Sequence, residues 1–119
     1  MSGKKINAAI VGASGYSGEE LVRLLLGHPH VNLSVLTSRQ YAGQAVTSVF
    51  PRFAGYAGAS GLTFSEPSID LLADKAQAVF LALPHGVAAE FAVPLAKRES
   101  VQLEFETERG LAYQVFFKT

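Results

Sequence analysis

The stretch IVGASGYSGEEL, Ile10 to Leu21, places three glycines at intervals of three residues between an apolar run and a leucine-rich segment. The apolar run, Ile6–Val11, has the length and composition of a buried strand. Glu19–Leu26 carries Leu and Val at helical spacing, and the Gly-His-Pro triplet after it is typical of a helix end. Val31–Leu36 has the composition of a second strand. This order of elements predicts a βαβ unit with parallel strands.

The sequence after this unit continues the alternation of strands and helices. Arg39–Gly61 is rich in glycine and aromatic residues and lacks a sustained period, so we expect a long connection with one helical turn. Leu62–Phe64 is a short strand candidate, and Ser68–Leu72 opens a short helix with its serine as N-cap. Ala76–Leu83 is apolar on both faces, as a central parallel strand is, and Val87–Leu95 can form a helix. The sequence predicts a Rossmann-like α/β fold with a doubly wound parallel sheet.

The character of the chain changes at Lys97, where charged residues become frequent. Apolar and polar residues alternate through Val101–Phe105, which is typical of a half-exposed strand, and Leu111–Phe117 can form another. We therefore expect an antiparallel C-terminal hairpin. The domain organisation that follows is a dinucleotide-binding domain over residues 1–96 and an atypical, strand-rich tail over residues 97–119.

Composition limits the function classes. The chain has 119 residues, enough for one domain, and ten Lys and Arg balance ten Asp and Glu. This balance gives no general attraction to nucleic acid. The absence of cysteine excludes disulfides, cysteine-ligated metals and a thiol nucleophile within these residues. The apolar run Ala8–Val11 is too short for a signal peptide or a membrane span, so we expect a cytosolic protein without a membrane partner.

The three glycines have the spacing and the context of a dinucleotide-binding turn. Gly12 permits the tight turn after the strand, Gly15 lets backbone approach a pyrophosphate, and Gly18 allows the helix to pack on the sheet. The N-terminus of the helix then binds the anion. Ser14 and Ser17 can add hydroxyl donors. The alternative is an ordinary glycine turn between a strand and a helix.

The end of the second strand bears on the choice of cofactor. An NAD site usually has Asp or Glu there to bind the ribose 2′-hydroxyl, whereas Leu36–Gln40 contains no acid and one basic residue, Arg39. A guanidinium beside hydroxyls suits a 2′-phosphate, which a carboxylate would repel. These residues favour NADP over NAD. The alternative is a solvated loop arginine.

The histidines give weaker indications. His85 follows the apolar strand at the end where open α/β sheets bind ligands, so it can contact the nicotinamide or the substrate, or serve only as a loop residue. His28 and His30 flank a proline in a helix-ending turn and are expected at the surface. We assign no metal ligand and no catalytic residue within the chain.

Three blocks of the sequence resemble N-acetyl-γ-glutamyl-phosphate reductase, an enzyme family of arginine biosynthesis. They are VGASGYSGEELVRLLLGHP, LTSRQYAGQ and FLALPHGVAAEF, in the order of the family, and they lie within Lys5–Leu95. The resemblance is to the N-terminal cofactor domain. Aspartate-semialdehyde dehydrogenase has a similar cofactor domain and is the nearest alternative family.

The resemblance implies an NADP-dependent reductive dephosphorylation of N-acetyl-glutamyl 5-phosphate to the semialdehyde. In the family a cysteine of the following domain attacks the acyl phosphate, hydride reduces the resulting thioester, and a histidine there assists proton transfer. The cofactor residues that the resemblance implies fall into three groups: Gly12, Ser14, Gly15, Tyr16, Ser17 and Gly18 for the phosphates, Ser38 and Arg39 for the 2′-phosphate, and Leu83, Pro84, His85 and Gly86 near the nicotinamide.

The tail departs from the resemblance. Lys97–Thr119 does not resemble the continuation of the family, and a thioester route needs the thiolate that this sequence lacks. We expect a piece or an altered product of the enzyme that binds cofactor and turns over nothing. A stand-alone nucleotide-binding module and an assembly component remain alternatives, and an unfinished sheet edge would favour a homo-oligomer.

Overall fold

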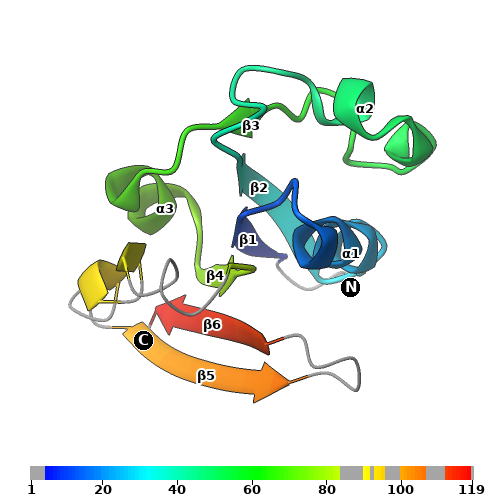
Figure 1. The fold of residues 1–119 in the computed structure, drawn as a ribbon. Helices are drawn as coiled ribbons and strands as arrows, with labels where there is room; N and C mark the ends of the chain where they lie inside the picture. The colour runs from blue at the N-terminus through cyan, green and yellow to red at the C-terminus, as the bar shows by residue number, and fades with distance from the viewer. Residues whose placement is uncertain (1–4, 84–89, 92, 96–99, 107–111, 119) are drawn as a thin grey trace.

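The computed structural model describes residues 5–83, 90–91, 93–95, 100–106 and 112–118. Residues 90–91 and 93–95 are helical. The other elements, shown in Figure 1, are β1 (Ile6–Val11), α1 (Tyr16–Leu26), β2 (Val31–Thr37), α2 (Val46–Val49), the 3-10 helix η1 (Pro51–Phe53), β3 (Phe64–Ser65), α3 (Ile69–Lys75), β4 (Ala78–Leu81), β5 (Ser100–Glu106) and β6 (Ala112–Lys118).

The strands form one sheet in the order β3-β2-β1-β4-β6-β5. β1 pairs in parallel with both β2 and β4, and β2 pairs in parallel with β3. This parallel sheet confirms the predicted Rossmann-like α/β fold. β6 runs antiparallel to both β4 and β5. Residues 107–111, which would form the turn of the predicted hairpin, lie outside the described residues, so the hairpin itself stays a prediction.

The parallel part of the sheet is covered on both faces, which explains why β4 is apolar throughout and β1 nearly so. Ala8 and Ile10 of β1 face a core cluster that includes the buried side of α1. Ala9 and Val11 alternate with them and face a second cluster, to which α3 and Phe91 contribute. Figure 1 shows α1 and α3 on opposite sides of the strands. This arrangement is the doubly wound one that the sequence predicts.

The boundaries of α1 and α3 follow from their caps. α1 begins at Tyr16, three residues before the predicted Glu19, because Gly15 in extended conformation serves as its N-cap. α3 confirms the predicted cap, since the Ser68 hydroxyl accepts a hydrogen bond from the Leu71 amide at 3.3 Å.

The predicted long connection after β2 contains α2 and η1 in place of one helical turn. An isolated bridge pairs Ala45 with Thr63, so β3 starts at Phe64 rather than at Leu62. Aromatic rings hold the connection together: Phe50 packs edge-to-face on both Phe53 and Phe64. Because Phe64 belongs to β3, these contacts tie the connection to the edge strand of the sheet.

Within the described part of the chain, no helix combines the length and the apolar character that crossing a membrane requires.

Candidate functional site

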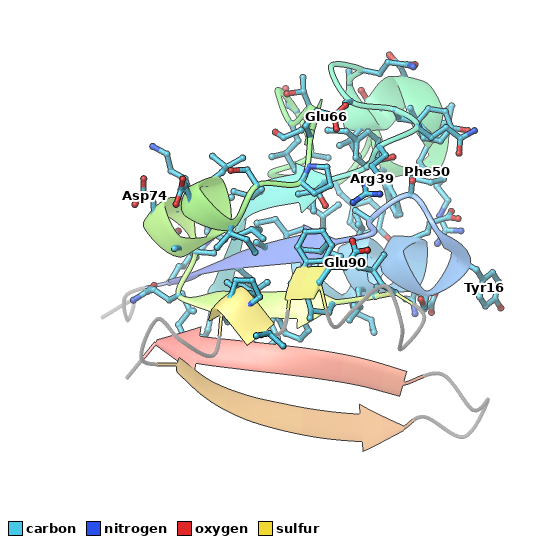
Figure 2. All side chains as sticks on the ribbon, turned by 60° about the vertical axis from the view of Figure 1, so that its left-hand side comes forward. Tyr16, Arg39, Phe50, Glu66, Asp74 and Glu90 are labelled. Carbon is cyan, nitrogen blue, oxygen red and sulfur yellow. The ribbon has the colours of Figure 1, made fainter. Side chains whose placement is uncertain are left out.

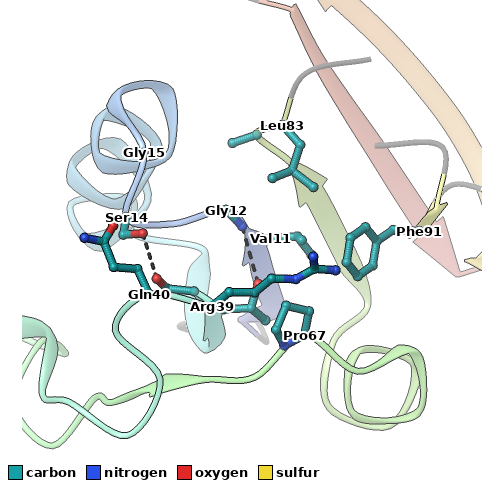
Figure 3. Close-up of a pocket in the computed structure, with 12 residues that line it drawn as sticks. Val11, Gly12, Ser14, Gly15, Arg39, Gln40, Pro67, Leu83 and Phe91 are labelled. Carbon is teal, nitrogen blue, oxygen red and sulfur yellow. Dashed lines mark hydrogen bonds between the residues drawn. The ribbon is translucent and has the colours of Figure 1, made fainter. Parts of the chain in front are cut away.

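A cavity of about 290 Å³ lies at the carboxyl ends of β1, β2 and β4 (Figure 3). The position is the one where ligands bind in open α/β sheets, because β1 lies between β2 and β4 and the strand order changes direction there. The cavity is lined by Val11, Gly12, Ser14, Gly15, Thr37, Ser38, Arg39, Gln40, Pro67, Ala82, Leu83 and Phe91.

Gly12 makes the turn out of β1 in a conformation that favours glycine. Its φ is +83°, and a Cβ there would lie 2.7 Å from the carbonyl oxygen of Ala82. The turn is tied to β2, because the amide of Ala13 donates to the Thr37 carbonyl oxygen at 2.9 Å. Main-chain contacts from two neighbouring strands therefore hold the start of the glycine loop.

Gly18 and Gly15 differ in what surrounds them. A Cβ on Gly18 would lie 2.1 Å from the carbonyl oxygen of Gly12 and 2.8 Å from Cα of Ala13, so only glycine lets α1 pack this closely. A Cβ on Gly15 would meet only the Gly12 oxygen, at an ordinary 3.6 Å. Gly15 also has an ordinary φ of −76°. The fold thus requires glycine at position 18, whereas at position 15 it leaves an open surface beside the cavity.

The N-terminus of α1 begins at this open surface. Gly15, its N-cap, lines the cavity and makes no side-chain capping hydrogen bond. The amides of a first helical turn have no acceptor within the helix, and the helix dipole favours an anion there. Tyr16 is exposed and starts the helix together with Ser17, but neither residue is part of the cavity lining. The arrangement suits a phosphate group next to Gly15.

Two serine hydroxyls join the glycine loop to the end of β2. Ser14 Oγ lies 2.7 Å from Ser38 Oγ, and Ser38 Oγ also accepts a hydrogen bond from the Tyr41 amide at 3.1 Å. Because Ser38 is only 4% exposed, we assign its hydroxyl hydrogen to Ser14. The hydrogen of the more exposed Ser14 hydroxyl then remains available to a ligand in the cavity.

Arg39 reaches across the mouth of the cavity. Its side chain is 68% exposed, and its Nη2 lies 3.6 Å from Oε2 of Glu90, whose side chain is 62% exposed. Figure 2 labels both residues on the same side of the sheet. The residues beside Arg39 in this loop, Thr37, Ser38 and Gln40, include no acid. The carboxylate near Arg39 comes instead from Glu90, in a different segment of the chain. Our reading of the sequence did not single out Glu90, because only the fold brings it to Arg39.

The predicted nicotinamide residues are described only in part. Leu83 lines the cavity, while Pro84, His85 and Gly86 lie outside the described residues. Pro67 and Phe91 line the cavity and were not predicted. Pro67 follows the short strand β3, whose end also lies at this edge of the sheet. The predicted strand before Pro67 was therefore the sequence signal that could have placed it at the cavity.

The remaining histidines lie away from the cavity. His28 and His30 follow α1 and are exposed. Their rings are arranged edge-to-face, with 5.9 Å between the ring centroids. Among the residues that the structure describes, no group of three or more His, Cys, Asp or Glu side chains could hold a metal ion.

Comparison with known proteins identifies a cofactor domain. The family model of the semialdehyde dehydrogenase NAD-binding domain matches residues 7–103. An N-acetyl-γ-glutamyl-phosphate reductase of Akkermansia muciniphila is 52% identical over 80% of this chain and 27% of its own length. A reductase of LysW-linked L-2-aminoadipate and L-glutamate phosphates from Saccharolobus solfataricus is 48% identical over 76% of this chain and 25% of its own.

A third relative aligns with nearly the whole chain. An N-acetyl-γ-glutamyl-phosphate reductase of Methylacidiphilum infernorum is 41% identical over 95% of this chain and 33% of its own length. The chain thus spans about a quarter to a third of the curated relatives that it matches. The names of these relatives bear out the resemblance seen in the sequence. The family match continues to residue 103, across the predicted boundary after residue 96, and that boundary stays a prediction.

Proposed function

The chain belongs to the family of the semialdehyde dehydrogenase NAD-binding domain, and from this premise we propose that it binds NADP(H) for an N-acetyl-γ-glutamyl-phosphate reductase. The family is one of oxidoreductases, so a nicotinamide cofactor is its common ligand. NADP rather than NAD, and the acyl phosphate of N-acetyl-glutamate as substrate, are the finer parts of the proposal.

The observation that carries the proposal is the contrast between Gly15 and Gly18. Internal packing requires glycine at position 18. A Cβ on Gly15 would come no nearer than 3.6 Å to its neighbours in the fold, so packing does not require glycine at position 15. A ligand whose phosphates approach the backbone at Gly15 would account for the glycine, and the N-terminus of α1 would bind their charge. The residues present therefore fit a dinucleotide, with Gly12, Ser14 and Gly15 lining its place and Tyr16, Ser17 and Gly18 following in the first helical turn.

Arg39 supports NADP over NAD. Its guanidinium is exposed at the end of β2, where it could donate to a 2′-phosphate, and no carboxylate occurs in the adjoining residues of that loop. Ser38 would act indirectly, because its hydroxyl already bonds to Ser14 and to the Tyr41 amide. We therefore propose that Arg39 contacts the 2′-phosphate and that Ser38 positions the loop.

The division of labour in the reaction follows from the residue types. The bound nicotinamide would supply the hydride, and the residues of this chain would bind and orient the cofactor. The sequence contains no cysteine, so the thiolate that the family resemblance implies would come from outside these residues. We propose that the 119 residues alone bind cofactor without turnover, and that adding a cysteine-bearing catalytic domain in trans would give reductase activity.

The Saccharolobus relative favours a second candidate substrate, because its name gives LysW-linked amino-acid phosphates. Assays of reconstituted enzyme with both kinds of phosphate would separate the candidates. A cytosolic location and a homo-oligomer complete the proposal, and fractionation and size-exclusion chromatography test them.

The decisive experiment for the cofactor is a titration of the chain with NADPH and with NADH. We expect NADPH to raise the melting temperature more than equimolar NADH does, because the tighter ligand stabilises the folded state more. Arg39→Ala should weaken NADPH binding about tenfold to hundredfold, as loss of hydrogen bonds to a charged group does, and should leave NADH binding within about twofold.

The matched control is Arg23→Ala, which removes a guanidinium paired with Glu20 on the outer side of α1. This variant should bind both cofactors as the unaltered chain does. Equal stabilisation by NADPH and NADH, unaffected by Arg39→Ala, would overturn the preference for NADP. Absence of binding by either cofactor at millimolar concentration would overturn the proposed function.

A further inference from the structure

Helical residues 90–91 bring a carboxylate to the mouth of the cavity. Phe91 lines the cavity and is buried, and its neighbour Glu90 faces Arg39. In Figure 3 the Arg39 side chain extends past Pro67 toward Phe91. The guanidinium that would bind a 2′-phosphate thus lies beside an acid from another part of the chain.

The geometry of this pair indicates an interaction that opens easily. The 3.6 Å between Arg39 Nη2 and Glu90 Oε2 exceeds the length of a good charge-assisted hydrogen bond, and both side chains are more than 60% exposed. Exposed ion pairs of this kind contribute little to stability. A contribution to the stability of the fold therefore does not explain why Glu90 lies beside Arg39.

The same pair has a direct consequence for an anionic ligand. A carboxylate beside Arg39 offsets part of the positive charge that attracts a phosphate, so the carboxylate and the phosphate compete for one guanidinium. A ribose with a free 2′-hydroxyl carries no charge and does not take part in this competition. NADP(H) and NAD(H) differ only at the 2′ position of the ribose, so the Glu90 carboxylate affects the difference between their binding free energies.

We propose that Glu90 is a specificity-determining residue, whose carboxylate competes with the 2′-phosphate of NADP(H) for Arg39 and thereby narrows the preference for NADP(H) over NAD(H). The inference rests on the proposed function, since it requires that a nicotinamide dinucleotide occupies the cavity. In the cofactor-free protein Arg39 makes a loose contact with Glu90 at the cavity mouth, and NADP(H) binding exchanges this contact for one with the 2′-phosphate.

The test is Glu90→Gln, which keeps the size of the side chain and removes its charge. The dissociation constants of NADPH and of adenosine 2′,5′-bisphosphate should fall about three- to tenfold, as expected for removal of an exposed charge a few ångströms from a phosphate. Those of NADH and 5′-AMP should change less than about twofold on the same grounds. The gain for NADPH should shrink in high salt, which screens the carboxylate.

The matched control is Asp74→Asn, which removes the same charge from the exposed side of α3, away from Arg39 and Glu90 in Figure 2. This variant should bind every probe as the unaltered chain does. Melting curves of both variants establish that the fold is intact, because neither side chain is buried.

A double variant tests the route through Arg39. In an Arg39→Gln background, Glu90→Gln should no longer improve NADPH binding by more than about twofold, since the competition has been removed. A full gain in that background, or no gain in the single variant while NADPH still binds the unaltered chain, would overturn this inference and leave the proposed function standing. Failure of the unaltered chain to bind either cofactor would overturn both.

Discussion

The loop after β1 and the loop after β2 form two sides of one cavity but differ in how they are held. Gly12–Gly18 is fixed by main-chain contacts so close that two of its three glycines accept no Cβ. The loop Thr37–Gln40 starts with two buried residues, which are followed by the exposed Arg39. In the proposed function the first loop would bind the phosphates that NADP and NAD share, and the second would meet the ribose 2′ position at which they differ. Rigid backbone and adjustable side chain thus serve separate tasks.

The largest effect should come from Gly18→Ala. Its new Cβ would lie 2.1 Å from the Gly12 carbonyl oxygen, and main chain cannot move aside as a flexible side chain can. We expect a loss of about 3 kcal/mol or more in the free energy of unfolding, at the upper end for overpacking. Urea denaturation followed by circular dichroism measures it.

Gly27→Ala is the control for Gly18→Ala, because its Cβ would come no nearer than 3.8 Å to any neighbour at the other end of α1. That variant should remain within about 1 kcal/mol of the unaltered chain. Equal stability of the two variants would contradict the close packing of the glycine loop.

Gly15→Ala should separate binding from stability. The fold has room for the methyl group, so the free energy of unfolding should change by less than about 1 kcal/mol. The methyl group would meet the phosphates of a bound cofactor, and overpacking there should cost about 1–3 kcal/mol of binding energy for NADPH and NADH alike. Urea denaturation measures the free energy of unfolding, and isothermal titration calorimetry measures the affinities for NADPH and NADH. Unchanged affinity would show that the cofactor does not approach Gly15.

The smallest effect should come from Ser38→Ala, which cuts the hydroxyl link between the two loops. Loss of the buried oxygen leaves the Tyr41 amide without this acceptor, at a cost of about 1 kcal/mol in stability. NADPH binding should weaken less than it does with Arg39→Ala. Ser48→Ala, on an exposed position of α2, is the control and should change neither. A loss of NADPH affinity equal to that of Arg39→Ala would assign Ser38 a direct phosphate contact.

Local patterns predicted the parts of the fold that local interactions decide. The boundaries of β1 and the cap at Ser68 are as predicted, because a two-sided apolar run and a serine before a helix are signals within a few residues. The start of α1 was placed too late, since Tyr16 and Ser17 show no apolar period and the cap is a glycine. Sequence reasoning assigned the glycine loop correctly to the edge where the cavity lies.

Contacts between distant segments explain what sequence reasoning missed. β3 depends on the bridge from Ala45 to Thr63 and on aromatic packing, which no local period reveals. Glu90 is an ordinary acid in a predicted helix, and only the fold brings it to Arg39. The candidate site could therefore be predicted as glycines and an arginine, but not as an ion pair between the loop after β2 and the helical residue Glu90.

The close packing of Gly18 on Gly12 also has a thermodynamic consequence. A loop already confined by its own main chain has little conformational entropy left to lose when a ligand arrives. The long side chain of Arg39, by contrast, has rotamers to give up. The entropic penalty of recognition should thus concentrate in that single side chain, which leaves the glycine loop ready before any cofactor is present.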